Sequence, residues 1–446
     1  MFGLRLLGLV LLLFCLGCGS ASPLVQPQIN SLVVAHRPEL ALKLLEEHKE
    51  SYGAKNRLLY LLDYGLVLHL TERYKESIGI FEEAKRVFDQ LYQRSISNEM
   101  TTWAMNDTLA PYRGEEFERV MINIFQALNF VMLGNFEEAL VEARDVDLKL
   151  GLMNTARKAR YKNVYREDAF ARLLMGILYE ARGTLDDLND AFISYAKAVE
   201  IYEQDYSRNY AISLPQVLKE NILAVSQSIR PQDYETYRRK FRDVPFPGLS
   251  EKKKRAEVYL IYYAGLSAVK HPVFVPIPLP DGIVTQLAFP TFDQRGPGSQ
   301  AAVFRAKNLR GEMFEMNSEK LEDITSIAIQ NLKSKRTWVI AKATLRAASK
   351  YWLEKKQKQR IEEKNDDAAQ IFGVVSSFYN IFSEQPDLRS WQTLPAEIHL
   401  ARVILEPGEY EFFVNEESLE KLTLTQGAKK FFIVRENTLS SLESKK

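Results

Sequence analysis

The first half of the chain repeats a helical pattern of apolar and polar positions. Its clearest copy occupies residues 61–84, where Leu61 and Gly65 fall on one helical face and Phe81 and Ala84 follow after a polar break. Apolar residues three or four positions apart share one face of a helix. Small residues beside a large aromatic one allow two helices to cross closely. The pattern therefore predicts a pair of packed helices.

Similar patterns return at residues 127–143 and 173–198, and half of one precedes them at 38–45. They resemble the tetratricopeptide repeat, a pair of helices that stacks on its neighbours. From this resemblance we expect a tetratricopeptide-like helical solenoid over residues 31–245, with the small and aromatic residues in its core. The concave side of such a solenoid suits the binding of another protein. Partner binding is therefore the expected function of this half.

A segment at 95–118 interrupts the repeats. It contains Tyr112, Arg113, Glu115 and Glu118. Insertions in repeat proteins often loop over the binding face, so these four residues are candidate partner contacts. The same charges could instead cap and solvate a helix that begins near Glu115. The sequence leaves both interpretations open.

The pattern changes in residues 246–446. Residues 256–306 and 397–434 contain short runs of alternating, β-branched and aromatic residues, which are typical of strands. The pair Pro407-Gly408 separates two such runs and predicts a hairpin between them. We expect these strands to form a small β-sandwich-like domain.

Residues 318–382 return to helical spacing between the two groups of strands. Asn317 or Ser318 is the expected N-cap of the first helix. The charged stretch 355–364 alternates in sign, which favours a solvated helix face over a nucleic-acid patch. The whole pattern predicts an α+β protein: an N-terminal all-α tetratricopeptide-like solenoid followed by a C-terminal β-sandwich-like domain with a helical insertion.

Residues 1–17 have the form of a signal peptide, because Arg5 precedes an apolar run that is too short to span a bilayer. The tetrapeptide Cys15-Leu16-Gly17-Cys18 resembles the lipobox of bacterial lipoproteins. That resemblance implies acylation of Cys18, a linker over 18–30, and sorting to the outer membrane because no Asp follows Cys18. The alternatives are an ordinary secretory signal with an incidental cysteine, and a short helix with no targeting role.

Composition narrows the classes of function. The chain has 59 Lys and Arg against 58 Asp and Glu, so loss of the signal with Arg5 leaves no net charge and argues against nucleic-acid binding. Both cysteines lie at or before Cys18, which leaves no thiol for a disulfide or a metal cluster. The five histidines have no metal-binding spacing, and no phosphate loop or serine-nucleophile motif is present. We expect neither an enzyme nor a bound cofactor or metal.

Three segments together resemble a family of poorly characterised tetratricopeptide-containing bacterial lipoproteins, over nearly the whole mature chain. They are Tyr112-x-Gly114-Glu115-x-x-Glu118, Gly265-x-x-x-x-Lys270 and Asp387-x-Arg389-Ser390-Trp391-x-x-Leu394-Pro395. Members of this family tend to be encoded near lipoproteins that activate peptidoglycan synthases. The resemblance implies a role in the cell envelope and no enzymatic activity.

Asp387, Arg389 and Trp391 form the other group of candidate partner contacts. Buried at the junction of the two domains, they would make a structural ion pair and a stacking contact. Alternatively, the Arg389 fork and the Trp391 ring could bind a peptide carboxylate or a sugar. The residues alone do not exclude the second interpretation.

These observations predict an outer-membrane-anchored lipoprotein that faces the periplasm and binds another envelope protein through its helical groove. They predict no nucleic-acid partner. Two alternatives stay open. One is a cell-wall glycan- or peptide-binding factor, or an enzyme, with a site at the domain junction; the other is an accessory subunit of a secretion or motility assembly.

Overall fold

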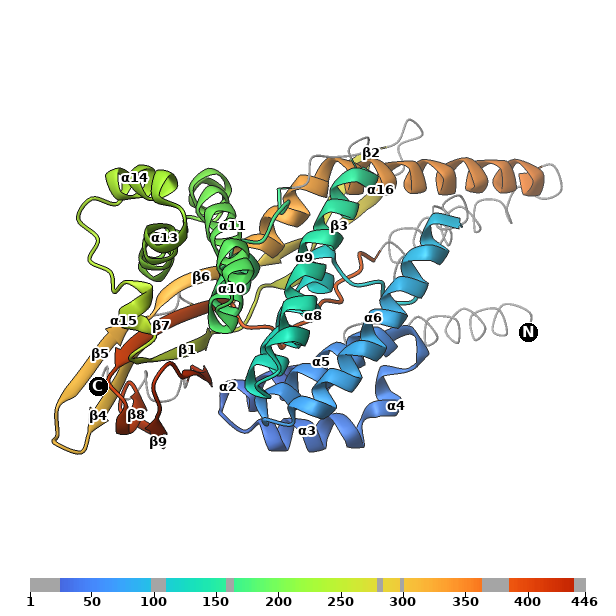
Figure 1. Ribbon diagram of the computed structural model, residues 1–446. Helices are drawn as coiled ribbons and strands as arrows, with labels where there is room; N and C mark the ends of the chain where they lie inside the picture. The colour runs from blue at the N-terminus through green and yellow to red at the C-terminus, as the bar shows by residue number, and fades with distance from the viewer. Residues whose placement is uncertain are drawn as a thin grey trace.

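The computed structural model describes residues 25–97, 110–157, 164–278, 284–296, 301–362 and 385–436. Within them the protein has an α+β fold, with helices in the N-terminal half and sheets in the C-terminal half (Figure 1). The predicted signal peptide, Cys18 and the part of the predicted helical range 318–382 beyond residue 362 lie outside the described residues.

Among the described residues, the first 252 positions of the chain contain helices and no strand. In order they are α2 Gln26–Val34, α3 Pro38–Glu47, α4 Lys49–Tyr52, the 3₁₀ turn η1 Ala54–Asn56, α5 Arg57–Leu70, α6 Tyr74–Ser97, α8 Glu116–Met132, α9 Phe136–Arg157, α10 Ala169–Arg182, α11 Leu185–Ile201, the π turn η3 Tyr202–Tyr206, α12 Ser207–Asn209, α13 Gln216–Ile229, α14 Pro231–Lys240 and α15 Leu249–Lys252. Helix α2 begins inside the segment predicted as a linker, because Ile29 and Val33 on one of its faces are buried in the core.

Three of the helical pairs coincide with the three predicted copies: α5 with α6, α8 with α9, and α10 with α11. The two helices of a pair pack closely where a glycine on one leaves room for an aromatic ring of the other. A methyl group at Gly65 would lie 2.7 Å from the Phe81 ring, and one at Gly176 would overlap the Tyr195 ring. The Ser77 hydroxyl also donates a 2.7 Å hydrogen bond to the Gly65 carbonyl.

The C-terminal half contains ten strands and one long helix among the described residues. They are β1 Ala256–Ala264, β2 Val269–Pro278, β3 Val284–Asp293, β4 Val303–Asn308, β5 Met313–Asn317, β6 Glu319–Asp323, α16 Ile324–Glu362, β7 Glu397–Leu405, β8 Gly408–Val414, β9 Glu417–Leu424 and β10 Lys429–Arg435. They form two four-stranded sheets, ordered β10-β1-β7-β6 and β5-β4-β8-β9, and a ribbon of β2 and β3.

Strand β1 is buried on both faces. Alternate residues such as Val258 and Leu260 join a core shared by the two four-stranded sheets. Their neighbours Tyr259 and Tyr263 join the large core that also contains the helices. The first sheet is therefore a middle layer, and one of its faces shares a hydrophobic core with the helices.

Two expectations about this half are wrong. Residues 319–323 form strand β6 instead of the start of a helix, because they pair with β7 and bury Leu321. The helix begins at Ile324, and the Asp323 side chain accepts a hydrogen bond from the Ser326 amide in its first turn. Pro407-Gly408 does not close a hairpin. Both edges of β7 already pair, with β1 and β6, so the turn carries the chain to the other sheet.

Candidate functional site at the junction of the two halves

The segment 387–395 runs between the helices and the first sheet, and it brings the predicted site residues together. Arg389 is fully buried. Its guanidinium donates to both carboxylate oxygens of Asp387, at 2.8 and 2.7 Å, and to the Asn56 side chain and the Ala110 carbonyl, each at 3.1 Å. The same group lies over the Tyr112 ring, 5.4 Å from its centroid.

Trp391 is also buried, but it does not stack on Arg389. Its ring meets Phe81 of α6 and Phe125 of α8 edge-on, at centroid distances of 5.9 and 5.8 Å. Its amide donates to Glu118 at 2.7 Å and its indole nitrogen to Thr393 at 2.9 Å. The prediction that Arg389 and Trp391 would stack is therefore wrong, and the aromatic partner of Arg389 is Tyr112.

Glu115 and Glu118 form a capping box at the start of α8, since Glu118 accepts the Glu115 amide at 2.8 Å. They also join three parts of the chain. Glu118 accepts hydrogen bonds from Tyr112 and Trp391, whereas Glu115 accepts one of 2.5 Å from Lys270 of β2. Lys270 in turn donates to the Arg389 carbonyl at 3.0 Å. The three segments that carry the family resemblance thus meet at one place.

The pKa values of the two glutamates at this junction are shifted in opposite directions. Burial alone would raise the pKa of Glu115, but Lys270 and Lys335 outweigh it and hold that pKa below its ordinary value. Burial, together with the charge of Glu115, raises the pKa of Glu118. The junction therefore holds one carboxylate whose ionised form is stabilised by two lysines beside one whose ionised form is disfavoured by burial and by the charge of Glu115.

Sequence reasoning missed the polar chain that continues from Trp391. Thr393 donates to the carboxylate of Asp63 at 2.9 Å, and Tyr52 and Gln26 donate to it at 3.0 and 3.1 Å. Burial raises the pKa of Asp63 to about 7. An acidic residue inside the apolar stretch 57–70 is the signal that could have revealed a buried carboxyl here.

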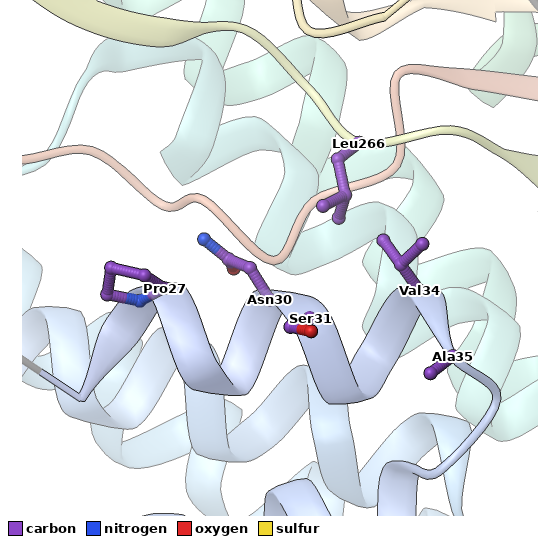
Figure 2. A pocket seen from close by; sticks show the side chains of 6 residues that line it. All are labelled: Pro27, Asn30, Ser31, Val34, Ala35 and Leu266. Atoms are coloured by element: carbon purple, nitrogen blue, oxygen red, sulfur yellow. The ribbon is translucent and has the colours of Figure 1, made fainter.

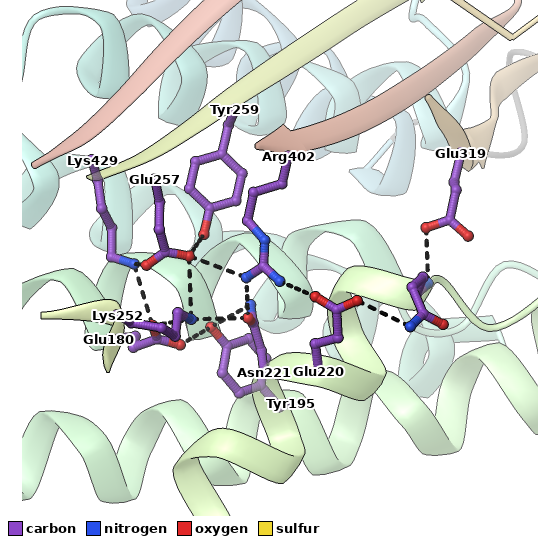
Figure 3. A network of polar contacts seen from close by, with 11 residues as sticks. Glu180, Tyr195, Glu220, Asn221, Lys252, Glu257, Tyr259, Glu319, Arg402 and Lys429 are labelled. Carbon is purple, nitrogen blue, oxygen red and sulfur yellow. Dashed lines mark hydrogen bonds and ion pairs between the residues drawn. The ribbon is translucent and has the colours of Figure 1, made fainter. Parts of the chain in front are cut away.

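A second polar cluster, also missed, joins the helices to the first sheet (Figure 3). Lys252 contacts Glu180 at 2.5 Å and Glu257 at 3.2 Å, and Lys429 of β10 pairs with the same two carboxylates. Arg402 of β7 adds contacts to Glu257 at 3.1 Å, Glu220 and Asn221. Charges inside the apolar strands 256–264 and 397–405 were its only sequence signal.

His69 forms a smaller polar bridge between the halves. Its ring nitrogens lie 2.6 Å from Asn129 of α8 and 2.9 Å from the Tyr263 hydroxyl of β1. Burial lowers the pKa of His69 to about 4. The imidazole is therefore neutral at physiological pH and acts as a hydrogen-bonding link.

These contacts bury most of the predicted partner-binding residues. Tyr112, Glu118, Arg389 and Trp391 all have less than a tenth of their surface exposed, and Arg113 is half-buried beside them. A partner could not reach the buried four without opening the core. The geometry favours the structural interpretation of both groups, as a cap and an ion pair that join the halves.

A small hollow lies beside the junction, between α2 and the turn after β1 (Figure 2). It measures about 330 Å³ and is lined by Pro27, Asn30, Ser31, Val34, Ala35 and Leu266. No acidic or basic side chain lines it, so it offers no group for acid-base chemistry.

Comparisons with known proteins give no match: no family model fits the chain, and searches of curated proteins and of solved structures find none that resembles it. Within the described ranges no group of three His, Cys, Asp or Glu could hold a metal ion. No helix of these ranges is both long and apolar enough to cross a membrane.

Proposed function

We propose that the protein is an acylated lipoprotein of the bacterial outer membrane that faces the periplasm and binds another envelope protein. In this proposal its helical half is a tetratricopeptide-like solenoid. The observation that carries the proposed solenoid is the set of three helical pairs, in which Gly65 and Gly176 leave room for the rings of Phe81 and Tyr195. Stacked helical pairs serve in many proteins as binding surfaces.

The surface left for a partner is the side of the helical pairs that the C-terminal half does not cover. Asp63, Glu118 and Glu180 project from α5, α8 and α10 toward the C-terminal half, so the chain itself fills that side of the pairs. Helix α9 presents a different, open side. Val141, Leu148 and Leu152 on it are 52%, 61% and 60% exposed.

Those three residues lie seven and four positions apart, which puts them on one face of α9. Single exposed leucines are common on protein surfaces, but an apolar stripe along one helix marks an interaction site. We therefore assign partner binding to this stripe rather than to the buried junction.

Affinity capture from detergent-solubilised envelopes tests the partner surface. Leu148→Ser with Leu152→Ser should abolish capture of a partner that the unchanged protein retains, because the stripe loses its apolar area. Leu185→Ser is the matched control, since Leu185 is 72% exposed on α11. Equal capture by the double variant and the unchanged protein would remove α9 from the proposal.

Metabolic labelling tests the anchor. Labelled palmitate should enter the protein when Cys15→Ser is made and should be lost with Cys18→Ser. Incorporation that persists in the Cys18→Ser protein would show that position 18 is not acylated. The two cysteines are three residues apart, so the pair controls for effects on secretion.

A further inference from the structure

We infer that the exposed face of α16 binds the surface of a bilayer that contains anionic phospholipids. This membrane contact does not depend on acylation of Cys18. Helix α16 has 39 residues, among them ten Lys or Arg and only two Glu. Its charge excess stands out in a chain whose formal net charge is +1. Even the stretch 355–364, predicted to be a solvated helix face, contains five Lys or Arg against two Glu.

One side of α16 is already used within the protein. Ala343 joins a small core with Leu287 and Phe289 of β3, and Val339 and Ile340 pack against it. Lys335 pairs with Glu115 and Glu116 at the junction. These contacts fix which side of the helix faces outward over residues 335–343.

The outward side forms one continuous stripe. Steps of three or four residues place its members on a common face. They are Lys333, Thr337, Ala341, Thr344, Ala348, Trp352, Lys355 and Gln359, all exposed and none acidic. In Figure 1 the C-terminal part of α16 extends past β2 and β3, so this part of the helix lies beyond the strands.

The chemistry of the stripe points to lipid. Trp352 is 67% exposed, and its ring meets that of Tyr351 edge-on at 6.1 Å. The Lys355 ammonium lies 5.9 Å from the centre of the Tyr351 ring, and Lys356 is also exposed. Indole rings settle at the headgroup level of a bilayer, and neighbouring lysines reach anionic headgroups.

The middle of the stripe distinguishes lipid from nucleic acid. Between Lys333 and Trp352 it contains only Ala and Thr. A surface that binds nucleic acid neutralises successive phosphates with basic side chains, whereas small, weakly polar residues can lie flat against headgroups. The arrangement of basic ends with a small-residue centre therefore fits a membrane surface.

Co-sedimentation with vesicles tests the inference. The full chain carrying Cys18→Ser, which removes the proposed acylation site, is mixed with phosphatidylcholine vesicles with and without phosphatidylglycerol. Binding should rise with phosphatidylglycerol and fall with added salt. Lys355→Gln with Lys356→Gln should weaken it about thirtyfold, because each lysine near such a surface contributes roughly 1 kcal/mol and about 1.4 kcal/mol corresponds to tenfold.

The matched control is Lys421→Gln with Lys430→Gln, which removes the same charge from exposed positions on β9 and β10 and should leave binding unchanged. Equal binding to both vesicle types, or equal loss in the two double variants, would overturn the inference. Stronger binding to a DNA duplex than to the anionic vesicles would also overturn it, in favour of a nucleic-acid surface.

A probe at the tryptophan position locates the contact. With Cys15→Ser and Cys18→Ser in place, Trp352→Cys provides a single thiol for an environment-sensitive fluorophore. Its emission should shift to the blue with phosphatidylglycerol vesicles, and the same label at Lys421→Cys should not shift. A shift at both positions or at neither would contradict binding through α16. Palmitate labelling tests acylation separately, so the two proposals can fail independently.

Discussion

At the scale of single residues, the glycines at helix crossings determine how closely the pairs pack. Gly176 of α10 has the Tyr195 ring where a methyl group would stand. Tyr195 cannot move freely, because its hydroxyl donates to Glu180 at 3.0 Å and accepts from Asn221 at 3.1 Å. Two hydrogen bonds and the surrounding core therefore hold the ring against the glycine.

We expect Gly176→Ala to lower the free energy of unfolding by about 1 to 3 kcal/mol, the usual cost of overpacking a core. Gly151→Ala is the control, because Gly151 lies in α9 with no atom within 4 Å of the added methyl group. That change should stabilise the protein by up to about 1 kcal/mol through helix propensity. Urea unfolding of both variants measures the difference, and a stabilising Gly176→Ala would contradict the packing argument.

A second residue-scale prediction concerns Asp63. Because folding raises its pKa from 3.8 to about 7, the folded protein holds the proton at pH values where the unfolded chain has lost it. This stabilisation is complete below the unfolded pKa and is lost as the pH rises through about 7.

Asp63→Asn removes this titration and keeps a polar side chain. The free energy of unfolding of the unchanged protein, taken relative to Asp63→Asn, should fall by about 3 to 4 kcal/mol between about pH 4 and pH 7. Urea titrations across that range give the difference. A difference that does not vary with pH would show that Asp63 keeps an ordinary pKa in the fold.

At the scale of elements, strand β10 shows how alternation assigns neighbouring side chains to different environments. Lys429 lies in the cluster with Glu180 and Glu257, whereas Lys430 is exposed. Phe431 packs on Tyr259, with ring centroids 5.0 Å apart. Parallel pairing with β1 sets this register, so one strand supplies both an apolar contact and a buried charge.

Lys429→Gln should lower the free energy of unfolding by about 3 to 5 kcal/mol, because the buried carboxylates of Glu180 and Glu257 lose one of their cationic partners. Lys430→Gln, one position along the same strand, should change it by no more than about 0.5 kcal/mol. Thermal or urea unfolding measures both. Similar losses in the two variants would mean that the register of β10 differs from the one described.

At the scale of the whole molecule, polar clusters and one continuous core join the helical half to the sheets. Arg402 of β7 contacts Glu220 and Asn221 of α13 as well as Glu257 of β1. Since a buried polar network depends on every member being satisfied, loss of one member affects both halves. The protein should therefore unfold as one unit.

Hydrogen exchange tests this coupling. Arg402→Met should lower the protection of amides in α13 and in β1 by the same factor, because both lose a buried partner. The unchanged protein should show equal opening free energies for the slowest amides of the two elements. Loss of protection in only one of them would show that the halves unfold independently.

The periodicity of the chain was enough to predict the helical pairs and most of the strands. Repeated small and aromatic residues such as Gly65 and Phe81 required close helix crossings, and β1 lies at the start of the strand-like range 256–306. These features depend on periodicity, which local sequence records.

The pairing of distant segments could not be predicted from local periodicity. Residues 319–323 became a strand because β7 offered a free edge, and Pro407-Gly408 became a corner because both edges of β7 were then taken. The candidate contacts Arg389 and Trp391 were buried by partners such as Asn56 and Phe81, more than 300 residues earlier in the chain. Burial and pairing between such distant residues depend on the whole fold, and no local pattern encodes them.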